Sequence, residues 1–63
     1  MRGGHTYKHM SALDTVLRIY HVSYAGAYLW VCAKLEHQKY RYVYEMGNYV
    51  IKAEDREKWV LVE

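Results

Sequence analysis

The sequence predicts a single all-β domain of five short strands, and three observations support this. Residues 27–35 are apolar at every second position, which is typical of a strand with one buried face. Residues 15–24 are rich in Thr, Val, Ile and Tyr, which favour strands. Residues 40–46 alternate again and precede Gly47-Asn48, a dipeptide suited to a two-residue hairpin turn.

The length limits the chain to one small domain, residues 1–63, in which residues 1–5 around Gly3-Gly4 are expected to be a flexible arm. A domain of this size buries only about 60% of the surface that its unfolded chain exposes. A single cysteine excludes an internal disulfide, so stability must come from packing. The eight tyrosines and two tryptophans fit this requirement, because large rings bury much area in a thin domain.

The first two long strands are expected to form a hairpin with Ala25-Gly26 at its tip, preceded by a short strand or extended arm at residues 6–9. This register gives an apolar face that pairs Tyr24 with Ala27, Val22 with Leu29, Tyr20 with Val31 and Val16 with Leu35. The second face is mixed, and pairs His21 with Trp30, Ser23 with Tyr28, Ile19 with Cys32 and Leu17 with Lys34.

A second hairpin is expected from a turn at residues 37–39, a strand over residues 40–46, the Gly47-Asn48 turn and a strand over residues 49–53. Residues 54–58 begin with acids and suit one helical or 3₁₀ turn, because a helix N-terminus favours negative charge. Residues 59–62 then close the chain as a short strand.

A helical alternative is also open. Ser11 and Asp14 resemble a capping box, and apolar residues from Leu13 to Leu35 also fit helical spacing. The alternative fold is α+β, with one long helix on a three-stranded sheet. It would place Gly26 in the middle of the helix and leave apolar residues such as Trp30 facing water, so the strand interpretation is favoured.

The order of these elements resembles that of small SH3-like β-barrel proteins encoded by phages and other mobile elements. The resemblance lies in the Gly3-Gly4 entry with Tyr7, the Gly47-Asn48 dipeptide, and residues 49–55 leading into residues 59–62. It covers nearly the whole chain and is one of pattern. It implies a five-stranded barrel with a one-turn helix before the last strand, and a binding module that acts on nucleic acid or on a host protein.

The candidate binding surface is the second face of the first hairpin. Aromatic rings beside basic side chains can stack on bases or form a protein hot spot. The candidate binding residues are Trp30, Tyr28, His21, Lys34, Arg41 and Lys52. If Trp30 belongs to the core instead, the site is expected on Arg41, Val43 and Lys52.

Nucleic acid or a host protein is the expected partner, and a second copy of the chain is a further candidate. The alternative function is that of a phage or mobile-element inhibitor or adaptor that docks on one host enzyme. The net charge is only +2, but residues 1–44 carry six Lys and Arg against Asp14 and Glu36. An anionic partner is therefore an option.

No enzyme, cofactor or metal site is expected from the sequence. His5 and His9 would lie about 13 Å apart in an extended arm, too far for one metal ion. Cys32 has no catalytic motif around it, and no nucleophile elbow or phosphate-binding loop occurs. With no apolar run long enough for a membrane span or signal peptide, the expected location is the cytoplasm.

Overall fold

The strands of this protein form one antiparallel sheet with the order β4-β3-β2-β1-β5. The computed structural model describes residues 1–63. Its elements are β1 (Thr6–His9), β2 (Thr15–Ala25), β3 (Tyr28–His37), β4 (Val43–Lys52), the 3₁₀ helix η1 (Ala53–Lys58) and β5 (Trp59–Leu61). The all-β, five-stranded prediction is confirmed, and the long-helix alternative is wrong.

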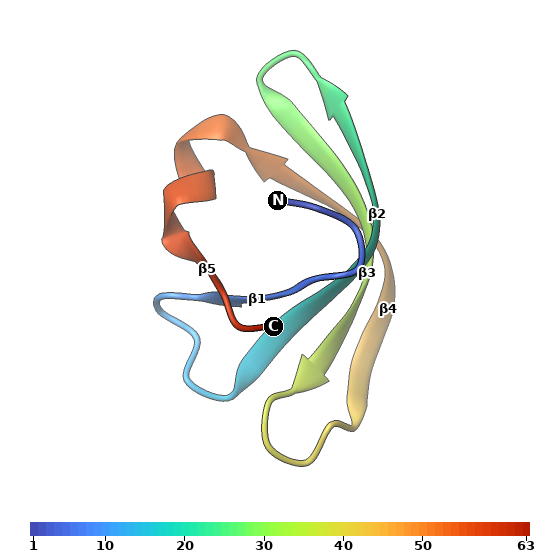
Figure 1. Cartoon of the computed structure of the whole chain (residues 1–63), viewed down its shortest axis with the longest axis vertical. Coiled ribbons are helices and arrows are strands. Elements are labelled where there is room, and N and C mark those ends of the chain that lie inside the picture. Colours follow the sequence, from blue (N-terminus) through green and yellow to red (C-terminus); the bar gives the residue numbers. More distant parts are fainter.

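The long strands β2, β3 and β4 form a curved layer, and β1, β5 and η1 lie on its concave side (Figure 1). β1 pairs with both β2 and β5, so it connects the two parts of the sheet. The end strands β4 and β5 are not paired with each other, and the sheet is not closed into a barrel. η1 links these two strands along the chain.

The hydrophobic core lies between the concave side of the long strands and the β1–β5 pair. β3 supplies its centre, because Leu29, Val31 and Ala33 are buried while Tyr28, Trp30 and Cys32 are exposed. This confirms the predicted alternation for residues 28–33, whereas Ala27 lies in the turn and is exposed. The buried cluster comprises Tyr7, Leu17, Ile19, Leu29, Val31, Ala33 and Ile51.

The β2–β3 turn lies one residue later than predicted, at Gly26 and Ala27. Gly26 has φ +61°, a conformation that suits the first central residue of a hairpin turn and that glycine adopts without strain. Val22 therefore pairs with Val31, and Tyr24 pairs with Leu29. The predicted register is wrong by two positions, although the faces near the turn are as expected.

A β-bulge at Tyr20 changes the faces in the other half of β2. The register shifts between Ile19 and His21, so that Ile19 pairs with Ala33 and Leu17 pairs with Leu35. An extra residue in one strand reverses the side on which the following residues lie. Ile19 and Leu17 are core residues, whereas Tyr20 is half exposed, which is the reverse of the prediction.

The predicted hairpin at Gly47-Asn48 is wrong, because β4 runs through these residues as one strand. Gly47 pairs with Ala33 and Asn48 pairs with Cys32. The irregularity of this pairing lies instead near Tyr44, where the register shifts between the pairs of Leu35 and Glu36. Pairing with β3 satisfies the backbone along the strand, and this outweighs the turn preference of the dipeptide.

The end of the chain is as predicted. η1 has Glu54 and Asp55 in its first turn and Arg56 and Lys58 in its last turn, an arrangement that matches the helix dipole. β5 follows directly and pairs with β1. The structure contains no helix with the length and hydropathy that a membrane span requires.

Residues 1–5 contact β2 along its bulge. The Gly4 amide donates to the Ile19 carbonyl at 2.8 Å, and the Ile19 amide donates to the His5 carbonyl at 3.0 Å. A Cβ atom at Gly3 would lie 2.7 Å from the carbonyl oxygen of Tyr20. Glycine is therefore required where this segment passes the bulge.

We expect the Tyr49→Phe variant to be more stable than the natural protein by up to about 1 kcal/mol, because the buried Tyr49 hydroxyl has no hydrogen-bond partner. Burial raises the pKa of Tyr49, and the Glu45 carboxylate adds to the shift. The folded state thus holds this proton more tightly than the unfolded chain does. The free energy of unfolding should therefore fall as the pH rises from about 10 through the higher folded pKa.

Urea unfolding of both proteins at pH 7 and above pH 10 measures these effects, and the Tyr49→Phe variant should lose less stability in alkali. Tyr40→Phe is the control, because the Tyr40 side chain is 67% exposed. Its stability at pH 7 should change by less than about 0.5 kcal/mol. A Tyr49→Phe variant clearly less stable than the natural protein would show that the hydroxyl is hydrogen bonded.

Candidate functional site

The candidate site is the outer face, defined as the exposed side of β2, β3 and β4 around Trp30. Trp30 is 52% exposed, although it lies on the middle strand of these three. Its partners across the sheet are Ser23 on β2 and Val50 on β4, both of which are exposed. The interpretation of Trp30 as a core residue is therefore wrong.

Tyr28 and Lys52 continue the outer face toward the β2–β3 turn. They are directly opposite each other on β3 and β4, so their side chains share this face. Along β3, Tyr28 and Trp30 are about 7 Å apart, the distance between alternate residues of a strand. Tyr28 and Lys52 also border a small open hollow of about 160 Å³ together with Ala27, Ala53 and Glu54.

His21 lies on the outer face beside Trp30 and opposite Cys32, rather than opposite Trp30 as predicted. The His21 Nε2 and Ser23 Oγ atoms are 3.3 Å apart, which is within hydrogen-bond distance. Both residues are exposed, as is Cys32. This part of the face is polar and adjoins the exposed Asn48 on β4.

Lys34 occupies the other end of the outer face. Its Nζ atom lies 5.4 Å from the centroid of the Tyr20 ring, a distance that suits a cation–π contact. Its partners across the sheet are Arg18 and Met46. Neither Lys34 nor Lys52 forms a salt bridge, so both charges are available to a ligand.

Arginine side chains hold the carboxylates of Glu36 and Glu63 near Lys34. Arg18 Nε donates to Glu36 Oε2 at 2.6 Å, and Arg18 Nη2 donates to Glu63 Oε1 at 3.0 Å. The hydrogen bond to Glu36 raises the pKa of Arg18 above its ordinary value, and the hydrogen bond to Glu63 adds to this effect. Both acids are therefore neutralised within the protein.

Arg41 is the predicted site residue that the structure does not place among the strands of the outer face. It lies in the β3–β4 loop with φ +60°, and its Nη2 atom donates to Glu63 Oε1 at 3.1 Å. Its guanidinium is thus already paired. The other predicted residues, Trp30, Tyr28, His21, Lys34 and Lys52, lie together on the outer face.

Three further apolar residues of the outer face were not predicted from the sequence. Val50, Met46 and Tyr20 are all at least 48% exposed, and they extend the aromatic surface on both neighbouring strands. Val50 and Met46 were not recognised because a turn was predicted at Gly47-Asn48. Tyr20 was assigned to the core face because the bulge was not predicted. If residues 43–52 are read as one continuous strand, Met46 and Val50 are expected on the same face of the sheet as Trp30.

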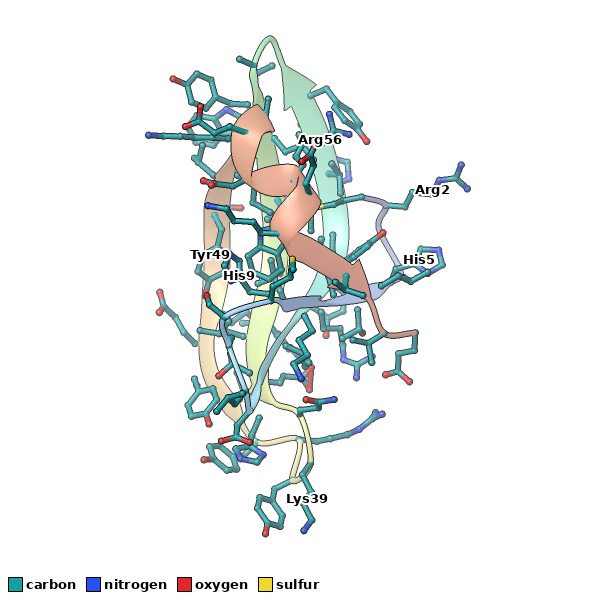
Figure 2. The ribbon with its side chains drawn as sticks, turned by 90° about the vertical axis from the view of Figure 1, so that its left-hand side faces the viewer. Arg2, His5, His9, Lys39, Tyr49 and Arg56 are labelled. Carbon is teal, nitrogen blue, oxygen red and sulfur yellow. The ribbon has the colours of Figure 1, made fainter.

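A second group of exposed aromatic side chains surrounds His37 at the β3–β4 loop. The His37 ring lies 4.9 Å from that of Tyr40 and 5.1 Å from that of Tyr42. His37 Nδ1 also accepts the backbone amides of Lys39 and Tyr40 at 3.2 Å, and Lys39 lies at this end of the molecule (Figure 2). These contacts indicate that His37 organises the loop.

The outer face presents exposed aromatic side chains and the unpaired positive charges of Lys34 and Lys52. No group of three or more His, Cys, Asp or Glu side chains is arranged to hold a metal ion. The carboxylates of Glu36 and Glu63 are both bound by Arg18. The exposed rings and two unpaired lysines suit the recognition of a macromolecule.

No protein-family model, no curated protein and no solved structure matches this chain at a significant level.

Proposed function

We propose that this chain is a non-catalytic binding module that docks on a protein partner through its outer face. The observation that carries the proposal is the half-exposed Trp30 on the middle strand, with apolar Val50 opposite and Tyr28 beside it. Aromatic side chains with apolar neighbours are typical of the centre of a protein interface. Large exposed apolar surfaces on small domains are otherwise unfavourable in water.

The charges around these residues define the partner further. Lys34 and Lys52 lie at opposite ends of the aromatic surface and are unpaired, while the nearby acids are bound by arginine. A complementary partner would present an apolar centre with acidic groups at its rim. Such an arrangement favours a correct orientation more than it adds affinity.

The fold supports an SH3-like classification of this module. The sheet order, with β5 beside β1 and a 3₁₀ helix between β4 and β5, agrees with the pattern of small SH3-like barrels. In this proposal η1 bridges the gap between the two end strands. The resemblance to phage and mobile-element proteins supports a narrower alternative, that of an inhibitor or adaptor of one host enzyme.

Single-stranded nucleic acid is a second candidate ligand. Trp30 and Tyr28 can each stack on one base, with a contribution of about 1 to 3 kcal/mol per base. Lys34 and Lys52 can contact the phosphates on either side, and β4 carries no acid on the outer face. Nucleic-acid binding would weaken steeply with rising salt through the release of counterions.

We expect the Trp30→Ala variant to remain folded and to lose partner binding. Half of the ring already lies in water, so the cost in stability should be about 1 kcal/mol or less. Removal of a central anchor should weaken binding by about 30-fold or more. Affinity capture from a host lysate, with and without nuclease, followed by titration of the captured partner, measures this effect.

The control is Tyr40→Ala, which removes an exposed ring from the β3–β4 loop and leaves the outer face unchanged. The protein-binding proposal predicts a partner that survives nuclease and binds the control variant normally. Loss of the partner on nuclease treatment would favour nucleic acid. Equal binding by the natural protein and Trp30→Ala would exclude the outer face as the site.

A further inference from the structure

The free edge of β4 is the longest unpaired strand edge in the protein. β4 has ten residues and is the last strand of the sheet, with β3 as its sole neighbour. In Figure 2 it forms the left-hand border of the molecule, and no ribbon lies outside it. The opposite edge, β5, has only three residues.

The backbone groups on this edge can be assigned from the pairing with β3. Ala53 donates its amide to the Ala27 carbonyl, and His37 donates to the Tyr42 carbonyl, at the two ends of the ladder. Hydrogen-bonded and non-bonded pairs alternate in an antiparallel ladder. The odd-numbered residues of β4 therefore bond to β3, and the outward-facing residues are Met46, Asn48, Val50 and Lys52.

This edge lacks the features that prevent strands from pairing. Proteins commonly protect an edge strand with charges, proline or a bulge in its middle. The central segment of β4, residues 46–51, contains no charged residue and no proline, and the register shift lies before it. The outward N–H and C=O groups are thus available to another strand.

We propose that β4 pairs in antiparallel fashion with β4 of a second copy of the chain, around a two-fold axis at Asn48. Asn48 then lies opposite Asn48 of the second copy, and Met46 lies opposite Val50 of the second copy. These pairs use outward-facing backbone groups on both strands and give about six hydrogen bonds. The two five-stranded sheets become one continuous sheet.

The side chains of β4 are self-complementary in this register, which favours a second copy over an unrelated peptide. On the outer face, Met46 meets Val50, and the two Asn48 amides can bond to each other. On the inner side, Gly47 leaves room for the ring of Tyr49 from the second copy. The charged residues Glu45 and Lys52 lie opposite Ile51 and Tyr44, so no like charges face each other.

The dimer would place both outer faces on the same side of the continuous sheet. This follows because opposite residues in an antiparallel pair share a face, and outward-facing Met46 and Val50 carry side chains on the outer face. In each chain, β4 would then lie between the two-fold axis and the strand β3 that carries Trp30. The dimer does not require the ligand proposed for the outer face, although Met46 and Val50 belong to both surfaces.

The test is the mass of the protein in solution, measured over a range of concentrations with a reductant present to keep Cys32 from cross-linking. We expect the natural protein to reach twice the 7.6 kDa of one chain. Asn48→Lys and Asn48→Asp each place like charges opposite each other at the axis. Each variant should have a dimer dissociation constant about tenfold or more higher.

An equal mixture of the two variants should recover the dimer, because lysine then faces aspartate across the axis. Leu13→Lys is the control, since it adds the same charge at an exposed position in the β1–β2 loop and should dimerise normally. A natural protein that stays monomeric at every concentration would overturn the proposal. Dimers unchanged in both Asn48 variants, or a mixture that stays monomeric, would also overturn it.

Discussion

The Ile19→Ala variant is expected to lose about 3 to 4 kcal/mol of stability. Ile19 is 0% exposed and lies in the buried cluster with Leu29 and Val31. Truncation of a buried isoleucine removes apolar contacts and leaves a cavity. A chain of this length has a total stability of roughly 3 to 9 kcal/mol, so the variant should be close to unfolded at room temperature. Urea unfolding followed by far-UV circular dichroism measures the loss.

Tyr20→Ala is the matched control, because it truncates the larger neighbouring side chain at the bulge. Tyr20 is half exposed and its ring contacts Lys34, so its loss should cost about 1 kcal/mol or less. The comparison tests the bulge directly. A hairpin without the bulge would bury Tyr20 and expose Ile19. Tyr20→Ala would then lose more stability than Ile19→Ala.

This comparison also explains why the sequence predicted only part of the first hairpin. The alternation of residues 27–35 identified β3 and its core face correctly, because a buried central strand leaves a strict pattern. β2 is apolar on both sides, with Ile19 next to Tyr20. Such a pattern does not indicate where the register shifts, and a shift of one residue exchanges the faces.

The error at Gly47-Asn48 has a different physical origin. The dipeptide favours a turn locally, but a ten-residue β3 offers backbone partners along its whole length. Exposed backbone groups at an edge cost less than a broken ladder, so the strand continues. Local turn preference was therefore a poor guide where a long neighbouring strand could pair.

The outer face was largely predictable because it depends on β3. Trp30, Tyr28 and Lys34 alternate with the core residues of one strand, and this places them together whatever the neighbours do. Arg41 was assigned to the same surface because residues 40–46 were expected to be a strand. In the structure, Arg41 lies in the β3–β4 loop in a left-handed conformation. Its guanidinium forms an ion pair with Glu63.

The Arg18→Met variant is expected to lose about 3 kcal/mol of stability, because it leaves Glu36 without its partner. The side chain of Glu36 is only 9% exposed, and its Oε2 atom lies 2.6 Å from Arg18 Nε. Removing one member of a buried ion pair leaves an uncompensated charge, which costs more than the pair itself contributes. Chemical denaturation at neutral pH measures the difference.

Glu36→Leu should be milder, with a cost of about 1 kcal/mol, because Arg18 is 27% exposed and keeps its hydrogen bond to Glu63. The double variant Arg18→Met/Glu36→Leu should recover most of the loss, since it leaves no buried charge. Arg41→Met is the control, because Arg41 is 61% exposed and bonds only to Glu63. Its cost should stay below about 1 kcal/mol.

The contrast between the two arginines should persist at high salt. Exposed pairs such as Arg41 with Glu63 are screened by ions, whereas the partly buried pair of Arg18 with Glu36 is screened much less. If Arg18→Met were as mild as Arg41→Met, the Glu36 carboxylate would have to reach water. In that case Glu36 would be an exposed acid beside Lys34, and an acidic rim on the partner would no longer be favoured.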